Sequence, residues 1–196
     1  LIAGWQARGE MLLKQQVIAN VPEQLRPHWH HASELTALGL AAITDYAGTD
    51  IGMLNGGLFM RDLPAGRVNR NDLHTMLPMH VIRVTLTGEA LWRLVYEMEL
   101  VRPFLNKFPI KGMGFRGQVF GYIQYQGLAW QAADHQLLVD GQPVDRQATY
   151  QIALLDHDLF IPFFPTLNIS GQTEILFEAM LRTVVGDYLA RQWPIH

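Results

Sequence analysis

The sequence has no cysteine among its 196 residues, so disulfides, thiolate metal sites and a cysteine nucleophile are all excluded. Serine is almost as scarce. Only Ser33 and Ser170 occur, and neither lies in the G-x-S-x-G turn that exposes a catalytic serine. Motifs for a phosphate-binding glycine-rich loop, a dinucleotide fold or an H-E-x-x-H zinc site are also missing. We therefore predict no catalytic residue, no metal ligand and no cofactor within this chain.

Long apolar runs and strong charge are missing too. No apolar stretch approaches the ~20 residues that a membrane-spanning helix needs, and the opening LIAGWQARGE is unlike a signal peptide. The formal net charge is −3 and the 15 lysines and arginines are scattered, so we expect neither a membrane nor a nucleic-acid partner. A chain without cysteine fits a cytoplasm and a cell envelope about equally. The location stays open, with the cytoplasm slightly favoured.

The length and composition favour one folded domain. Hydrophobic residues make up 49% of the chain and charged residues 17%, which is ordinary for a globular protein. A domain of this size buries roughly 70% of the surface that its unfolded chain exposes. The sequence does not start with methionine and opens like a strand or a linker, so we expect it to continue a longer protein. Residues 1–31 are then an entry segment, and residues 32–196 form the single folded domain.

Apolar periodicity outlines the secondary structure of the first half. Helical spacing begins at Ser33 and ends near Tyr46, and the apolar stretch at 50–54 reads as a buried strand. Alternation over residues 81–86 predicts a second strand, which a Thr-Gly turn joins to a helix. The stretch from Arg102 to Gly117 is rich in glycine, proline and aromatic residues, and it predicts an ordered surface loop.

The second half of the chain predicts further strands and a terminal helix. Residues 119–130 and 135–145 read as paired strands, with Asp140-Gly141 as the hairpin turn. Residues 149–160 (TYQIALLDHDLF) read as another strand that ends in a mixed acidic and aromatic stretch, and apolar spacing from Ile175 to Gln192 predicts a C-terminal helix. Helices and strands are mixed without regular βαβ repetition, so we expect a layered α+β domain.

The HWHH segment is the most conspicuous candidate for a metal site, because it places His28, His30 and His31 within four residues. A sound site also needs carboxylate or further histidine ligands from another element, and the sequence shows none at a recognised spacing. We favour a solvated or partly packed entry to the first helix. A histidine-cluster metal protein remains the alternative.

Three loops carry residues able to hold a planar or anionic ligand: 54–66 (LNGGLFMRDLPAG), 112–117 (GMGFRG) and 156–164 (DHDLFIPFF). Two aromatic faces can sandwich a base, each stack contributing ~1–3 kcal/mol, while Arg61 or Arg116 can bind a phosphate or carboxylate bidentately. The alternative is that the phenylalanines in these loops are core residues, as aromatic side chains more often are.

Several motifs in a fixed order resemble a known family. The segment ELTALGLAAITDYAGTDIGMLNGGLFMRDLPAGRVNRNDLHTMLP, followed by VTLTGEAL, is similar to the C-terminal domain of the bacterial 5′-nucleotidase family. The ordered elements are an acidic strand ending in asparagine, a glycine pair, a G-x-v-t-x-x-D-L segment, a proline and v-x-L-T-G. GMGFRG and YQIALLDHDLF resemble the branch found in Gram-positive bacteria. The resemblance covers roughly residues 15–192.

This resemblance implies an α/β/β/α layered domain that binds a nucleotide or nucleoside and positions it for hydrolysis. In the family, a separate N-terminal metallophosphoesterase domain of the same protein holds two divalent metal ions and the catalytic histidine. Its G-N-H-E and G-H-x-H motifs do not occur here, so the chain is expected to be incomplete as a hydrolase. The binding residues implied are Asn55, Gly56, Gly57, Arg61, His80, Arg116, His157 and Phe160.

Two positions differ from the family pattern. Met60 stands where an arginine is expected, with Arg61 one position later, and Met79 stands where a stacking phenylalanine is expected. Methionine makes an adaptable apolar surface. The alternative function is therefore a non-catalytic interaction or scaffold domain with a degenerate pocket.

Overall fold

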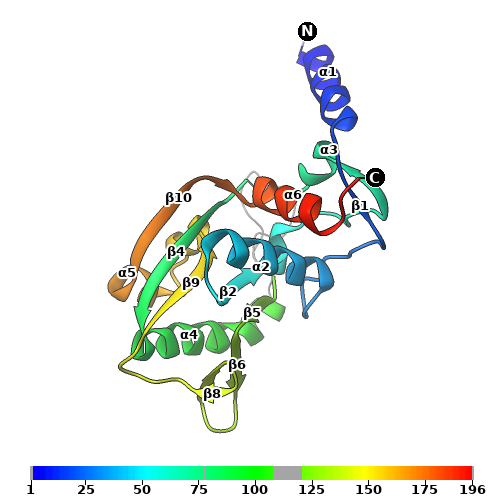
Figure 1. The fold of residues 1–196 in the computed structure, drawn as a ribbon. Helices are drawn as coiled ribbons and strands as arrows, with labels where there is room; N and C mark the ends of the chain where they lie inside the picture. The colour runs from blue at the N-terminus through cyan, green and yellow to red at the C-terminus, as the bar shows by residue number, and fades with distance from the viewer. Residues whose placement is uncertain (1, 77, 108–120, 196) are drawn as a thin grey trace.

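The computed structural model describes residues 2–76, 78–107 and 121–195. A five-stranded mixed sheet lies at its centre, in the order β10, β4, β9, β2, β5 (Figure 1). Strands β2 and β9 are parallel, and the other neighbouring pairs are antiparallel. The strands are β2 (Ile51–Asn55), β4 (His80–Thr87), β5 (Ile123–Gln126), β9 (Thr149–Leu155) and β10 (Gln172–Met180).

Both faces of this sheet are buried, because successive side chains of a strand point to opposite sides. In β9, Ala153 and Leu155 join the core beneath α2 and α6, whereas Ile152 and Leu154 join the core beneath α4 and α5. The predicted layered α+β class is therefore confirmed. These helices are α2 (Glu34–Ala47), α4 (Gly88–Lys107), α5 (Pro165–Ser170) and α6 (Leu181–Gln192).

Two smaller sheets complete the domain. One pairs two strands near the N-terminal helix, and the other is a three-stranded antiparallel sheet beside α4 (Figure 1). Trp92 of α4 donates its indole N–H to the carbonyl of His135 at 2.7 Å, which joins that helix to the second sheet. The remaining elements are α1 (Ile2–Gln15), β1 (Val17–Val21), η1 (Gly56–Leu58), β3 (Gly66–Asn69), α3 (Arg70–Leu73), β6 (Leu128–Gln131), β7 (Gln136–Val139), β8 (Gln142–Pro143) and η2 (Asp156–Phe160).

Local sequence signals set several boundaries as predicted. The hydroxyl of Ser33 caps α2 by accepting the Thr36 N–H at 3.2 Å, and Gly48 ends the helix with φ 64°, a value that glycine adopts readily. Strand β2 follows and is buried along its whole length. The hairpin turn also forms, with positive φ at both Asp140 and Gly141.

The predicted C-terminal helix was wrong in its first part. Residues 172–180 form the edge strand β10, and only Leu181–Gln192 is helical. Strand β10 pairs with β4, so that Thr173 lies opposite Val84 and Ile175 opposite Ile82. The spacing of apolar residues fits either structure, and this long-range pairing decides between them.

Three other stretches differ from the sequence prediction. Helix α4 continues to Lys107 where a loop was expected, and Arg102 donates to Glu99 one turn earlier although Pro103 lies within the helix. The start of the chain, Ile2–Gln15, is a helix rather than a strand or linker. Strand β5 pairs with β2, while β6 makes the predicted pair with β7. Within the described ranges, no helix combines the length and apolar character needed to cross a membrane.

Candidate functional site

Polar side chains gather at one edge of the central sheet, where the parallel strands β2 and β9 end and β4 begins. Asn55 is the last residue of β2, His80 is the first of β4, and Asp156, His157 and Asp158 follow β9. The carboxyl ends of parallel strands are a frequent place for ligand-binding side chains. The structure thus brings three of the predicted residues, Asn55, His80 and His157, to this edge.

Asn55 holds the edge together and is itself buried, with 3% of its surface exposed. Its Oδ1 accepts the N–H groups of Gly57 at 2.9 Å and Gly121 at 3.3 Å. These two donors fix the orientation of the amide, so Nδ2 donates to Nε2 of His157 at 2.9 Å. Asn55 therefore joins the predicted glycine loop, through Gly57, to the segment that precedes β5, through Gly121.

The acidic residues after β9 orient the neighbouring histidines. Asp156 accepts the backbone N–H of His80 at 3.1 Å, and its other oxygen lies 2.9 Å from His80 Nδ1. This contact places a proton on Nδ1 and leaves Nε2 of His80 for other partners. Burial raises the pKa of Asp158, although the adjacent His157 and the N–H of Leu155 favour the charged carboxylate.

The predicted glycines let another segment approach the backbone closely, and in the structure that segment is residues 28–29 of the same chain. A Cβ on Gly56 would lie 2.5 Å from the carbonyl oxygen of His28, so only glycine fits there without a shift of the backbone. The N–H of Tyr122 donates to the carbonyl of Trp29 at 2.7 Å, and the N–H of Gly56 donates to the carbonyl of Tyr122 at 2.9 Å. Residues 28–29 are thereby held over the glycine loop.

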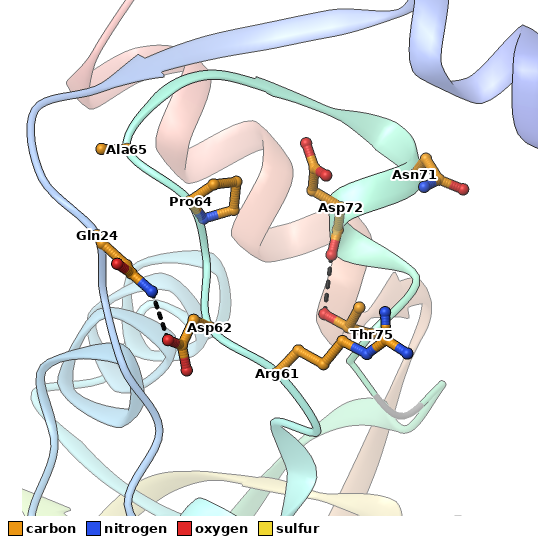
Figure 2. A pocket seen from close by; sticks show the side chains of 8 residues that line it. All are labelled: Gln24, Arg61, Asp62, Pro64, Ala65, Asn71, Asp72 and Thr75. Carbon is orange, nitrogen blue, oxygen red and sulfur yellow. Dashed lines mark hydrogen bonds between the residues drawn. The ribbon is translucent and has the colours of Figure 1, made fainter.

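Arg61 lies between two surface hollows. Figure 2 shows the first, where the Arg61 side chain extends beside Thr75 and the side chains of Gln24 and Asp62 are hydrogen-bonded. This hollow has a volume of about 420 Å³ and the second about 290 Å³. The first is lined by Gln24, Arg61, Asp62, Pro64, Ala65, Asn71, Asp72 and Thr75, and the second by Pro27, His28, Trp29, His30, Met60, Arg61 and Asp62.

The chemistry of the second hollow, which we call the Arg61 hollow, is mixed. Among the described residues no carboxylate lies within 4.0 Å of the Arg61 guanidinium. Trp29, which also lines the hollow, is 36% exposed, and Met60 is partly buried against the core beneath α2 and α6. Partial desolvation, together with the neighbouring imidazoles of His31 and His30, lowers the pKa of His28. The hollow therefore offers one cation, one aromatic face, one apolar contact and imidazole hydrogen-bonding groups, and it is also lined by the carboxylate of Asp62.

This arrangement gives the HWHH segment a place that the sequence analysis missed. The sequence indicates only a helix entry or a histidine metal cluster for this segment, yet His28 and Trp29 line the same hollow as Arg61. In the sequence, the Gly56-Gly57 pair could have indicated this contact, because glycines let another segment of the chain approach the backbone closely. Within the ranges that the structure describes, no group of three histidine, cysteine, aspartate or glutamate side chains could hold a metal ion. Those residues do not fit the metal centre of a metallophosphoesterase.

Phe160, another of the predicted residues, lies apart from the hollow. Phe160 is 84% exposed on η2 and lines neither of the two hollows beside Arg61. Phe164, in the same predicted loop, is fully buried, as the core interpretation expected. Met79 is partly buried against the core beneath α2 and α6. Arg116 lies outside the described residues, so its predicted role stays a prediction.

Replacing Gly56 with alanine tests the packing of residues 28–29 on the loop. The added Cβ meets a main-chain oxygen, so we expect a loss of about 1–3 kcal/mol in the free energy of unfolding. We also expect the indole N–H resonance of Trp29 to move in the NMR spectrum. Gly9→Ala is the matched control, because a Cβ at Gly9 meets nothing within 4 Å and alanine favours the helix. Equal stabilities of the two variants would contradict this packing.

A sequence profile of the family described as 5′-nucleotidase, C-terminal domain, matches residues 16–160 of the chain. An uncharacterized metallophosphoesterase, YunD of Bacillus subtilis strain 168, is 28% identical over 184 residues. The match covers 89% of this chain and 39% of that protein. The chain therefore spans well under half the length of this relative.

Solved structures share the fold. A 5′-nucleotidase precursor from Thermus thermophilus superposes with a TM-score of 0.75 at 20% identity, over 97% of this chain and 39% of that one. The NAD nucleotidase of Haemophilus influenzae gives a TM-score of 0.68 at 14% identity, over 97% of this chain and 38% of that one. At these identities the likeness shows the layered fold, and the match again spans only part of each structure.

Proposed function

The chain belongs to the 5′-nucleotidase C-terminal domain family, and we propose that it is the substrate-recognition domain of a metal-dependent, 5′-nucleotidase-like phosphoesterase. In this proposal it binds a nucleotide or a related phosphate monoester, and a dimetal domain of the same protein hydrolyses the ester. The observation that carries the proposal is the Arg61 hollow, where a guanidinium without a described carboxylate partner lies beside an exposed indole.

The groups around this hollow suit the two parts of a nucleotide. The planar guanidinium of Arg61 can bind a phosphate through two parallel N–H groups. Trp29 presents a flat aromatic face to a base, a stack that contributes ~1–3 kcal/mol. Met60 adds an adaptable apolar contact, and the imidazoles of His28 and His30 can exchange hydrogen bonds with ribose hydroxyls.

The proposed division of work assigns no chemical step to this chain. A metal centre in another domain would supply the activated water and the Lewis acid. The residues of the Arg61 hollow bind the nucleoside portion and hold the ester in one orientation, which lowers the entropic cost of the reaction. Asn55 contributes indirectly, because it orders the glycine loop on which residues 28–29 rest.

The alternative of a scaffold domain would be favoured by Met60 and Met79 packed inside the protein with no cleft between the three loops. Both methionines are partly buried. Met60 nevertheless lines the Arg61 hollow. The methionine that stands in place of the expected arginine therefore forms an apolar side of the hollow, next to the guanidinium of Arg61. This observation favours recognition of a ligand over a purely structural role.

A titration of the 196-residue chain with adenosine 5′-monophosphate, followed by ¹H–¹⁵N NMR, tests the proposed function. We expect the largest saturable shifts at the side-chain signals of Arg61 and Trp29, with adenosine producing the Trp29 shift more weakly. Uridine 5′-monophosphate is the comparison ligand, because a smaller base stacks less strongly. Absence of shifts at both residues up to millimolar ligand would overturn the site. Hydrolysis of either nucleotide by this chain with Mn²⁺ would contradict the division of work.

A further inference from the structure

A further cavity, lined by two arginine side chains, is formed by residues of α1, α3 and α6 and of the turn after α3. We call it the α3–α6 cavity. Its volume is about 110 Å³. It shares no lining residue with either hollow beside Arg61. The cavity is lined by Leu13, Arg70, Leu73, His74, Arg182 and Thr183.

The acidic and basic side chains of the short helix α3 face different hollows. Its acidic residue, Asp72, lines the larger hollow beside Arg61, where its backbone oxygen accepts the Thr75 hydroxyl (Figure 2). Arg70 and His74, four positions apart and so on one side of the turn, line the α3–α6 cavity instead. No acidic residue of the described ranges lines this cavity, so its potential is positive.

The two arginines of the cavity lack carboxylate partners among the residues that the structure describes. No aspartate or glutamate oxygen of these residues lies within 4.0 Å of Arg70 or Arg182. Arg182 contacts only weak or neutral acceptors, Nδ1 of His74 at 3.4 Å and the sulfur of Met180 at 3.7 Å. Burial and then the charge of Arg182 lower the pKa of His74, so its imidazole accepts this contact in the neutral form.

The start of α6 adds to the positive potential. Arg182 and Thr183 lie in its first turn, which contains no acidic residue, and Met180 makes no side-chain cap to the helix. The first N–H groups of a helix lack partners within the helix and carry a partial positive charge. Two guanidinium groups, a threonine hydroxyl and this helix end therefore surround one small space.

We propose that the α3–α6 cavity binds a tetrahedral oxyanion of the inorganic phosphate class. Arg70 and Arg182 bind its oxygens, as guanidinium groups do in phosphate sites generally. The Thr183 hydroxyl and the N–H groups of α6 after Leu181 contribute further donors, since the N–H of Leu181 already donates to the carbonyl of Met79. The cavity has about a quarter of the volume of the larger hollow beside Arg61, which favours a free oxyanion over a whole nucleotide. This site is independent of the proposed nucleotide site.

Titration of the 196-residue chain with inorganic phosphate at constant ionic strength tests the proposal. We expect saturable NMR shifts of the His74 imidazole and of the Arg182 side chain, with sulfate competing and chloride without effect. Arg182→Gln and Arg70→Gln should each weaken phosphate binding about tenfold, since each removes a charge-assisted contact. Arg93→Gln is the matched control, because Arg93 is exposed on α4 and lines none of these cavities.

The outcomes separate this site from the nucleotide site. Arg61→Ala should leave the phosphate-induced shift of His74 unchanged, and the double variant at Arg70 and Arg182 should leave nucleotide shifts at Trp29 unchanged. A His74 shift that is not saturable, or that survives the double variant while its spectrum remains that of a folded chain, would overturn the proposal. So would loss of the shift in Arg61→Ala, because phosphate would then occupy the Arg61 hollow.

Discussion

Arg61→Ala is expected to weaken binding of a nucleoside monophosphate to this chain by about 10- to 100-fold. The guanidinium is exposed at the Arg61 hollow, and no carboxylate of the described residues neutralises it within 4.0 Å. Its charge is therefore available to a phosphate. Removing it takes away a charge-assisted pair of hydrogen bonds without leaving a buried group unsatisfied, so the fold should be retained. Isothermal titration calorimetry with adenosine 5′-monophosphate measures the change.

Two further variants separate charge from geometry at this position. Arg61→Lys keeps the positive charge and loses the planar fork, so its affinity should fall between those of the parent chain and Arg61→Ala. Arg67→Ala is the matched control, because Arg67 is also exposed and lines neither hollow beside Arg61. The Arg61 assignment is refuted if the Arg61→Ala affinity equals that of the parent chain while the control loses binding.

Asn55→Leu is expected to lower the free energy of unfolding by about 2–5 kcal/mol, because each buried polar group left without a partner costs about 1–3 kcal/mol. The N–H groups of Gly57 and Gly121 both lose their acceptor in this variant, and the contact to Nε2 of His157 is lost as well. Leucine branches at Cγ as asparagine does, so the change removes the polar contacts with little change of side-chain shape. Urea denaturation at neutral pH gives the difference.

The conservative variant at this position identifies which contacts matter. Asn55→Asp retains an oxygen that accepts the two glycine N–H groups, and we expect it to recover part of the stability. Asn168→Leu is the control, because the Asn168 side chain is exposed where it donates to the carbonyl of Leu159. A loss at Asn55 no larger than the loss at Asn168 would show that this buried network does not stabilise the loop.

Sequence alone predicted those parts of the fold that local chemistry decides. Helix α2 begins after Ser33 and ends at Gly48, because a side-chain cap and a glycine in the left-handed conformation each act within one turn of the helix. Asn55 lies between a predicted strand and two glycines, and the resemblance implies it as a binding residue. In the structure its side chain accepts the backbone N–H of Gly57. The motif order that resembled the 5′-nucleotidase family agrees with the profile match over residues 16–160.

Long-range contacts account for what the sequence could not predict. Residues 172–180 have apolar spacing that fits a helix, and only pairing with β4 makes them a strand. Trp29 lies 32 positions before Arg61 in the chain, and the packing of residues 28–29 on Gly56 brings the two to one hollow. Phe160, which the resemblance implies as a binding residue, is exposed and does not line that hollow, so its role stays a prediction.

The α3–α6 cavity escaped sequence reasoning for a similar reason. Arg70 and Arg182 are 112 positions apart and belong to no motif, so nothing in the sequence indicated that they share one space. Their proximity follows from the packing of α3 against α6, where the side chain of Leu73 lies against Gly186. A charged site that is made by tertiary packing becomes visible only once the elements are placed.

Intermolecular nuclear Overhauser effects between adenosine 5′-monophosphate and this chain test the central claim most directly. The account predicts contacts from the base protons of the nucleotide to the Trp29 indole and to the methyl group of Met60, which line the Arg61 hollow together. Contacts confined to Phe160 and His80, with none to Trp29 or Met60 under saturating ligand, would contradict it.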